Sequence, residues 1–279
     1  MIKKISMNIN LEKALAIAEK ASMEGGKILL NHFGKLENVR EKSIQGDLVT
    51  EADNASEYAI TTIIKKHFPS HPIIGEEGGL IPSKDTDYLW AIDPLDGTTN
   101  YTHQMPVFAI SIGLLYKMEP VVGLVYNPIT NELFKAIKEK GAYLNDRQLF
   151  VTKTETLSKS LLATGFAYDR RDTKDNNYLE FCYLTSITHG VRRGGSAALD
   201  LAFVAAGRYD GFWERGLKIW DIAAGALLVK EAFGSLSSYE NGPIDLETGR
   251  ILATNGLLHN ELSETLIRVR QEYPPILFR

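Results

Sequence analysis

The chain has 279 residues, and its 31 lysine and arginine residues stand against 35 aspartate and glutamate residues, which gives a formal net charge of −4. Hydrophobic residues make up 44% of the composition and charged residues 24%, a balance typical of globular proteins that excludes an intrinsically disordered chain. The slight acidic excess argues against a nucleic-acid partner, because nucleic-acid-binding proteins usually carry a basic excess or a basic stripe.

Two amphipathic helices open the predicted fold. Apolar residues recur at spacings of three and four over residues 11–31 and again over 53–68, which predicts a helix in each range. The polar segment 34–46 between them is predicted to be an irregular loop. The short apolar segments that follow, divided by turn residues, predict an antiparallel sheet covered by the two helices. The predicted strands are 72–75, 88–92, 107–115, 120–126, 132–137, 142–144 and 148–151.

After about Thr152, strands and helices alternate, which predicts a layered α/β arrangement. We expect an N-terminal half, residues 1–152, with most of the candidate ligands, and a C-terminal half, residues 153–279. No Pro/Gly/Ser-rich linker separates them, so the two halves should pack closely. The predicted elements of the second half are strands at 161–164, 211–213 and 251–254 and helices at 176–188, 196–206, 221–232 and 259–271.

The sequence also bears on the compartment. A single cysteine, Cys182, permits no intrachain disulfide and no cysteine-based zinc site, and its apolar neighbours predict a place in the core. Residues 1–10 hold no apolar run suited to a signal peptide, and no run of about 18 apolar residues occurs anywhere. We therefore expect a cytoplasmic protein that does not span a membrane.

The most informative segment is Trp90–Asn100, WAIDPLDGTTN. An apolar strand leads into Asp93, and Pro94 cannot donate to a sheet ladder, so the chain is expected to turn there. Asp96 follows, and Gly97 permits an unusual backbone angle. Two carboxylates on a tight turn before free amides could hold a hard cation and a phosphate together. On the two carboxylates alone, an Asx turn with a helix cap is the slightly better interpretation.

Further acidic residues change that balance. Asp47 and Asp53 precede or open the second helix, Glu76–Glu77 follows the strand at 72–75, and Asp221 opens an apolar helix. Each has an ordinary explanation, a helix N-cap for the aspartates and a solvated turn for the glutamates. Together they place carboxylates at the ends of several elements, where the ligands of an oxygen-rich metal site belong.

These segments resemble the inositol monophosphatase family, within the lithium-sensitive, magnesium-dependent phosphatase superfamily. They stand in the family's order and spacing over nearly the whole chain, and the run Asp-Pro-Leu-Asp-Gly-Thr-Thr is the most specific of them. The resemblance implies a layered α-β-α-β-α sandwich of the sugar phosphatase type and a homodimer. The matching segments are Asp47–Thr50 with Asp53, Gly75–Glu77, Trp90–Asn100, Gly195–Ala198 and Trp220–Gly225.

The resemblance also implies two to three Mg²⁺ ions in each subunit. Glu76, Asp93 and the carbonyl oxygen of Leu95 would hold the first ion. Asp93, Asp96 and Asp221 would hold the second, with Asp93 shared between the two. A third, weaker ion would lie near Glu76.

The remaining site residues are likewise implied by the resemblance. Asp47 and Thr98 would position the attacking water and help to deprotonate it, and Glu76 counts with them as catalytic. The amides of Gly97 and Thr98 are expected to bind the phosphate. The sugar or cyclitol is expected to contact Gly195, Ser196, Ala197 and Glu214. Asp221 is expected to lie at the departing hydroxyl.

Two stretches leave alternatives open. Gly78 and Gly79 stand where many members of the family have a hydroxyl residue, which leaves the affinity for the ion and the response to lithium open. Arg192 and Arg193 precede the glycines of the substrate side. They are either surface charge or a contact with a second phosphate or an interface.

The expected function is Mg²⁺-dependent hydrolysis of a small phosphate ester, with inositol 1-phosphate favoured. Thr98–Tyr101 resembles the inositol and sugar-phosphate branch, whereas the adenosine 3′,5′-bisphosphate branch typically carries a Lys-Glu pair after Gly-Thr. Fructose 1,6-bisphosphate remains open as a substrate, and another sugar or nucleotide phosphatase is the wider alternative. A regulatory binding protein that retains the fold is the non-enzymatic alternative, whose sign would be the loss of a ligand, and none is missing from the motifs.

Overall fold

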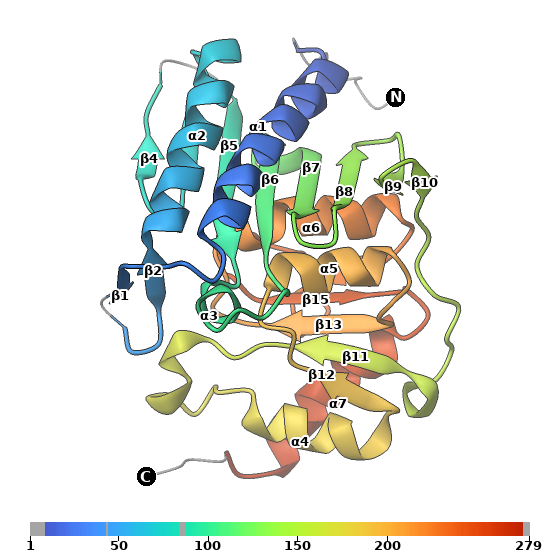
Figure 1. Cartoon of the computed structure of the whole chain (residues 1–279). Coiled ribbons are helices and arrows are strands. Elements are labelled where there is room, and N and C mark those ends of the chain that lie inside the picture. Colours follow the sequence, from blue (N-terminus) through green and yellow to red (C-terminus); the bar gives the residue numbers. More distant parts are fainter. Residues whose placement is uncertain (1–8, 43, 84–86, 276–279) are drawn as a thin grey trace.

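The computed structural model describes residues 9–42, 44–83 and 87–275. Figure 1 shows five layers, in which two helices cover a large sheet, two further helices separate it from a second sheet, and two helices lie on the far side of that sheet. This is the α-β-α-β-α arrangement, so the predicted fold class is confirmed. Residues 1–8, on which part of the compartment prediction rests, lie outside the described residues.

The outer helix layer consists of α1 (Leu11–His32) and α2 (Glu51–His67). The α2 helix begins two residues earlier than predicted because Thr50 is its N-cap and accepts the amides of Ala52 and Asp53. The Asp53 carboxylate in turn accepts the Thr50 amide at 2.9 Å, which completes a capping box. The expectation that Asp47 or Asp53 would be the N-cap is therefore wrong.

Part of the predicted loop at 34–46 forms a strand. In the structure, β1 (Val39–Glu41) pairs antiparallel with β2 (Leu48–Thr50). The Lys42 amide donates to the Asp47 carbonyl at 2.6 Å and continues the hairpin beyond β1. All three residues of β1 are exposed, so no alternation of apolar and polar residues marked this strand. Residue 43 lies outside the described residues.

The first sheet has eight strands in the order β10-β9-β8-β7-β6-β5-β3-β4. Its pairs are antiparallel except for β3 with β5, which are parallel, so these two strands end at the same edge. The predicted strand at 148–151 ends at Gln148, and β4 was not predicted. The strands are β3 (Ile73–Gly75), β4 (Gly79–Ile81), β5 (Tyr88–Asp96), β6 (Ala109–Tyr116), β7 (Glu119–Asn127), β8 (Glu132–Ile137), β9 (Ala142–Leu144) and β10 (Arg147–Gln148).

Strand β5 does not end at Pro94, as the sequence predicted, but continues to Asp96. Asp93 pairs with Ser111 and Asp96 pairs with Ala109, so three steps along β5 match two along β6. This irregularity accommodates the proline, which lacks the N–H that a regular ladder would require.

The second sheet has the order β12-β11-β13-β15-β14, with β12, β11 and β13 parallel and the remaining pairs antiparallel. Strands β12 and β14 have three residues each and were not predicted. The strands are β11 (Leu161–Thr164), β12 (Gly190–Arg192), β13 (Gly211–Glu214), β14 (Ser235–Ser237) and β15 (Ile251–Thr254). The other helices are α3 (Thr98–Thr102), α4 (Tyr178–Ile187), α5 (Ala197–Ala205), α6 (Ile219–Glu231) and α7 (His259–Glu272), with 3₁₀ turns η1 (Leu157–Lys159) and η2 (Tyr168–Arg171).

Helices α5 and α6 lie between the two sheets (Figure 1). Gly113 of β6 and Gly123 of β7 let α6 approach closely, because a Cβ atom on Gly123 would lie 2.6 Å from the carbonyl oxygen of Ala224. Side chains of β6, β7, α5 and α6 belong to one buried apolar cluster. This cluster contains residues from both sides of residue 152 and so does not separate the two predicted halves. The division of the chain at residue 152 stays a prediction.

The expectation that Cys182 packs in the core is wrong, because the residue is exposed on α4. The buried positions of α4 are Glu180 and Leu184, and Cys182 lies midway between them on the opposite side of the helix. Among the described residues, none of the helices combines the length and the apolar character needed to cross a bilayer.

Candidate active site

The candidate site forms where strand ends from both sheets meet the starts of helices from the outer and central helix layers and of the short helix α3. Strands β3, β5 and β13 end at Gly75, Asp96 and Glu214, and helices α2, α3, α5 and α6 begin nearby in space. Figure 1 shows these ends gathered beside the β1–β2 hairpin and α3. Because helix starts expose free amides, this edge suits an anionic ligand.

The end of β5 carries two carboxylates that the fold holds firmly. Asp93 is 2% exposed, and its Oδ1 accepts the Leu95 amide at 2.9 Å in an Asx turn. Asp96 accepts the Ser196 hydroxyl at 2.5 Å and the Ala198 amide at 2.7 Å. The contact of Asp93 confirms that an Asx turn forms here, and those of Asp96 join β5 to the start of α5.

Gly97 brings the loop that precedes α5, which contains Gly194 and Gly195, against the first sheet. Its φ is +101°, and a Cβ atom there would lie 3.2 Å from the carbonyl oxygen of Gly195. Asn100 donates to the carbonyl oxygens of Val107 at 2.7 Å and Gly194 at 2.9 Å. The amides predicted to hold phosphate and the groups predicted to face the sugar therefore belong to neighbouring segments.

Thr98 is linked to α2. Its hydroxyl lies 3.1 Å from Oδ1 of Asp53 and 3.0 Å from the carbonyl oxygen of Leu95. Burial raises the pKa of Asp53 to about 6, against the opposing effect of its hydrogen bonds from Thr50. Asp53 therefore has two partners, namely Thr50, which is the N-cap of α2, and Thr98, which is expected to orient the attacking water.

Lys42, which the sequence did not single out, is bound to the paired glutamates. Its ammonium lies 2.8 Å from Oε1 of Glu76, 2.7 Å from Oε1 of Glu77 and 3.8 Å from Oδ1 of Asp47. Burial raises the pKa of Glu77 to about 7, although its hydrogen bond from Lys42 opposes that shift. Burial also raises the pKa of Asp47.

The sequence predicted that Asp221 is the N-cap of α6. The structure places it instead at the third position of the helix. Its Oδ2 accepts the Lys218 amide at 2.7 Å, so it caps the helix from within the first turn. The Ser111 hydroxyl of β6 donates to the Trp220 carbonyl at 2.8 Å and fixes the start of α6 on the first sheet.

Glu214 ends β13 and is 8% exposed. Burial raises its pKa to about 8, with Arg193 opposing the shift and Asp96 adding to it. Gly165 must be glycine, because a Cβ atom there would lie 2.2 Å from the Glu214 carboxylate oxygens. Arg193 lies close by, its Nη1 being 2.7 Å from the place of a Cβ on Gly195. Arg192 and Arg193 are both exposed, so the surface-charge alternative and the contact alternative both stay predictions.

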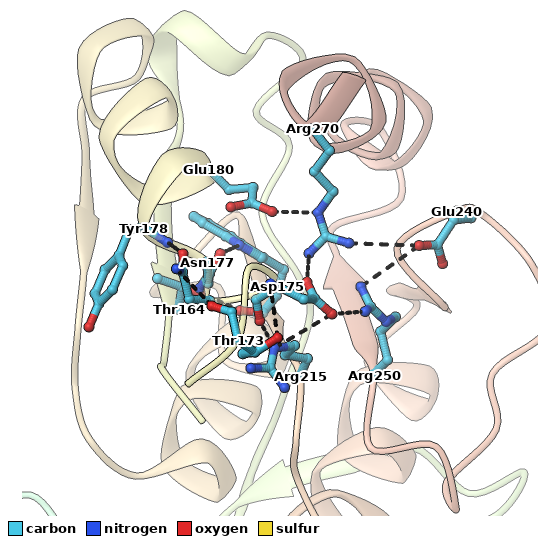
Figure 2. A network of polar contacts seen from close by, with 12 residues as sticks. Thr164, Thr173, Asp175, Asn177, Tyr178, Glu180, Arg215, Glu240, Arg250 and Arg270 are labelled. Carbon is cyan, nitrogen blue, oxygen red and sulfur yellow. Dashed lines mark hydrogen bonds and ion pairs between the residues drawn. The ribbon is translucent and has the colours of Figure 1, made fainter. Parts of the chain in front are cut away.

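A charged network holds the neighbouring segment 165–177 in place (Figure 2). Figure 2 shows Asp175 among Arg215, Arg250 and Arg270, and Nη2 of Arg270 lies 2.8 Å from its Oδ1. Arg215 also pairs with Asp169 at 2.7 Å. Because Arg215 directly follows Glu214, the network fixes this segment to the end of β13.

Tyr168 of that segment is a further residue that the sequence did not indicate. Tyr168 is 42% exposed, and partial desolvation of its hydroxyl raises its pKa. Four carboxylates of the site add to the shift by electrostatic repulsion of the phenolate, namely Asp47, Glu76, Asp96 and Asp221. Arg171, three residues further on, donates to the Gln45 carbonyl at 3.4 Å. Segment 165–177 therefore borders the same acidic space as the β1–β2 hairpin.

The central carboxylates raise one another's pKa. Burial raises that of Asp93 well above its ordinary value, and the charges of Glu76, Asp96 and Asp221 raise it further. Burial likewise raises the pKa of Asp221, with Asp96 and Glu76 adding to it, and brings that of Asp96 to about 6. The structure thus brings four predicted ligands from three separate parts of the chain within electrostatic reach of one another.

These groups fit a hard divalent cation in chemistry and charge, since all donors are oxygens and the buried like charges need compensation. As placed in the described part of the chain, no three histidine, cysteine, aspartate or glutamate side chains form a group that could hold an ion. The Lys42 ammonium compensates Glu76 and Glu77 in that arrangement. The metal-ligand assignment therefore stays a prediction, and the acidic side chains would have to reorient to share an ion.

Comparison with known proteins agrees with this geometry. A model of the inositol monophosphatase family matches residues 10–274. A relative from Synechocystis sp., named inositol-1-monophosphatase, is 53% identical over 262 residues, which are 94% of this chain and 91% of the relative. A relative from Pseudomonas aeruginosa, named Nus factor SuhB, is 43% identical over 275 residues, which are 96% of this chain and 100% of the relative.

Solved structures show the same fold. The structure of inositol monophosphatase from Anabaena (Nostoc) sp. matches with a TM-score of 0.87 and 50% identity, covering 96% of this chain and 99% of that one. The structure of the Thermotoga maritima IMPase matches with a TM-score of 0.82 and 32% identity, covering 94% of this chain and 98% of that one.

Proposed function

The chain belongs to the inositol monophosphatase family, whose members are phosphatases and are generally metal-dependent, and on that premise we propose that it is a Mg²⁺-dependent phosphate monoester hydrolase that prefers inositol 1-phosphate. The observation that carries the proposal is the carboxylate cluster formed by buried Asp93 and partly buried Asp96 and Asp221, whose negative charges lie near one another and near Glu76. Such a cluster is costly unless a cation or a proton compensates it.

We assign the ligands as the family resemblance implies. Glu76, Asp93 and the Leu95 carbonyl would hold one Mg²⁺, and Asp93, Asp96 and Asp221 a second, with a weaker third near Glu76. When bound, these ions would neutralise the phosphoryl oxygens of the substrate and supply an acidified water for in-line attack. The Leu95 carbonyl already accepts a hydrogen bond from Thr98, so this oxygen faces the same space as the threonine hydroxyl.

The protein's own groups would orient the reactants. Thr98, held by Asp53, and Asp47, at the end of the β1–β2 hairpin, would position the attacking water and accept its proton, with Glu76 beside them. The amides of Gly97 and Thr98 stand at the start of α3 and would donate to the phosphate.

The substrate's cyclitol would lie on the other side of the phosphate. Gly195, Ser196 and Ala197 at the start of α5, together with Glu214, would contact its hydroxyl groups, and Asp221 would face the departing one. The contact between Gly97 and Gly195 supports this arrangement, because it sets the phosphate-binding and cyclitol-binding groups side by side.

A substrate panel tests the assignment. In MgCl₂, we expect kcat/KM for inositol 1-phosphate to exceed that for fructose 1,6-bisphosphate, adenosine 3′,5′-bisphosphate and histidinol phosphate by roughly tenfold or more, since differential transition-state binding of about 1.4 kcal/mol suffices. EDTA should remove the activity, and added MgCl₂ should restore it. A clear preference for the nucleotide would contradict the choice of substrate but not of reaction.

One relative is named Nus factor SuhB, so the enzymatic proposal should be distinguished from the regulatory alternative. The same panel does so, because a folded protein that hydrolyses none of the four esters at any MgCl₂ concentration would favour a binding role. We further propose a homodimer and sensitivity to lithium, as the family resemblance implies, and a cytoplasmic location, as the sequence predicts.

A further inference from the structure

The turn that carries Glu76 and Glu77 rests on a buried carboxylate to which the proposed chemistry gives no role. Glu57 of α2 is 7% exposed, and its two oxygens accept two consecutive amides of that turn. Oε2 accepts the Glu77 amide at 2.9 Å and Oε1 accepts the Gly78 amide at 2.6 Å. Both acceptor atoms of a buried charged group are thus directed at one short piece of main chain.

The glycines on either side of the turn make room for this carboxylate. A Cβ atom on Gly75 would lie 2.6 Å from Oε2 of Glu57, and one on Gly78 would lie 2.6 Å from Oε1. Side chains at these two positions would therefore displace Glu57 or the turn.

The turn is fixed from a second side as well. The Glu76 amide donates to the Ile92 carbonyl of β5 at 3.2 Å, directly before Asp93. With its main chain held by Ile92 and Glu57, the turn presents both glutamate side chains on the Lys42 side, where Oε1 of each lies within 2.8 Å of the ammonium.

Helix α2 therefore supports the site at two points. Asp53, in its first turn, lies within hydrogen-bonding distance of the Thr98 hydroxyl, and Glu57, one helical turn later, holds the glutamate turn. We propose that Glu57 is a positioning residue for divalent-cation binding, which fixes the main chain of residues 76–78 so that Glu76 can reach the ion. This inference rests on the proposed function, since it takes Glu76 as a ligand.

The test is a thermal titration with MgCl₂ in the absence of substrate. A bound ion raises Tm by an amount set by the ratio of its free concentration to Kd, so the MgCl₂ concentration that produces a fixed rise, which we call the MgCl₂ midpoint, reports affinity without any turnover. In Glu57→Gln, one of the two accepting oxygens becomes an NH₂ group, which donates and cannot accept, so one amide of the turn loses its partner. We expect the MgCl₂ midpoint to rise roughly 10-fold or more, as for other residues that orient metal ligands, while saturating MgCl₂ restores kcat.

Glu231→Gln is the matched control. Glu231 also accepts two amides of a single turn, those of Glu139 at 2.8 Å and Gly141 at 2.9 Å, but it lies at the far end of α6 from Asp221. Both variants should lose a similar few degrees of Tm without MgCl₂, and only Glu57→Gln should shift the midpoint. An equal shift in both variants, or none in Glu57→Gln, would overturn the inference.

Gly78→Ala provides a second route should Glu57→Gln fail to fold. It keeps the carboxylate in the chain but sets a methyl group 2.6 Å from its Oε1, so either Glu57 or the turn must move and the MgCl₂ midpoint should rise in the same direction. An unchanged midpoint in a folded Gly78→Ala would count against Glu57. A wild-type Tm that MgCl₂ does not raise would instead refute the proposed metal dependence, and the role of Glu57 with it.

Discussion

Asp93→Asn is expected to lower kcat by roughly 1,000-fold or more, which corresponds to about 4 kcal/mol of lost transition-state stabilisation. Asp93 is the carboxylate that both proposed ions share, and an amide oxygen is a much weaker ligand than a carboxylate. The fold should survive, because an asparagine side chain at this position keeps an oxygen that can accept the Leu95 amide. The measurement is kcat for inositol 1-phosphate over a range of MgCl₂ concentrations.

The same variant should be at least as stable as wild type when no metal is present. Burial and three neighbouring carboxylates raise the pKa of Asp93, so its ionised form destabilises the folded state at neutral pH. Asp146→Asn, at an exposed position of the β9–β10 turn, is the control and should change neither kcat nor Tm. Activity within tenfold of wild type in Asp93→Asn would defeat the assignment of this residue.

The metal-free protein should become less stable as the pH rises from 6.5 to 8.5, with a fall in Tm of about 5 °C or more. In the folded state burial raises the pKa of Glu77 to about 7 and that of Glu214 to about 8, both from an ordinary value of 4.5. A carboxyl with a raised folded pKa binds more protons when folded, so its contribution to stability is lost as the pH rises through that pKa.

The raised pKa values of Asp93 and Asp221 act in the same direction, and the chosen range keeps the buried histidines out of the result. The buried imidazoles of His71 and His259 have pKa values lowered by burial, and they would destabilise the protein only below about pH 6.5. Glu214→Gln removes one titrating group and should flatten the dependence, and MgCl₂ should flatten it too. A Tm that is constant or increasing between pH 6.5 and 8.5 in EDTA would contradict the prediction.

The sequence could predict the longer elements. Helices α1 and α2 follow a helical periodicity because burial of one face sets it. Strands β6 and β7 are buried on both faces, and their apolar runs bounded by turn residues indicated them instead. The three-residue strands β1, β4, β12 and β14 are too short to show a period, and main-chain pairing defines them instead. Thr50 was missed as a cap because the neighbouring aspartates are equally good candidates by type.

The candidate site was predictable only in its motif residues. Asp93, Asp96 and Gly97 stand in one short specific run, and the family resemblance extends from it to Asp221. Lys42 and Glu57 carry no such signal. Their contacts with Glu76 and Gly78 span 34 and 21 residues of sequence, so only the folded chain reveals them.

The close fit of α6 against β6 and β7 has a consequence for how the molecule can move. Gly113 and Gly123 bring that helix directly onto the first sheet, and Ser111 fastens its first turn. This close contact between α6 and the first sheet holds Asp221 at the end of β5. It also opposes any motion that would open and close the two sheets relative to each other. The main chain that carries Asp93, Asp96 and Asp221 therefore stays in place, and the adjustments needed to share an ion fall to the side chains.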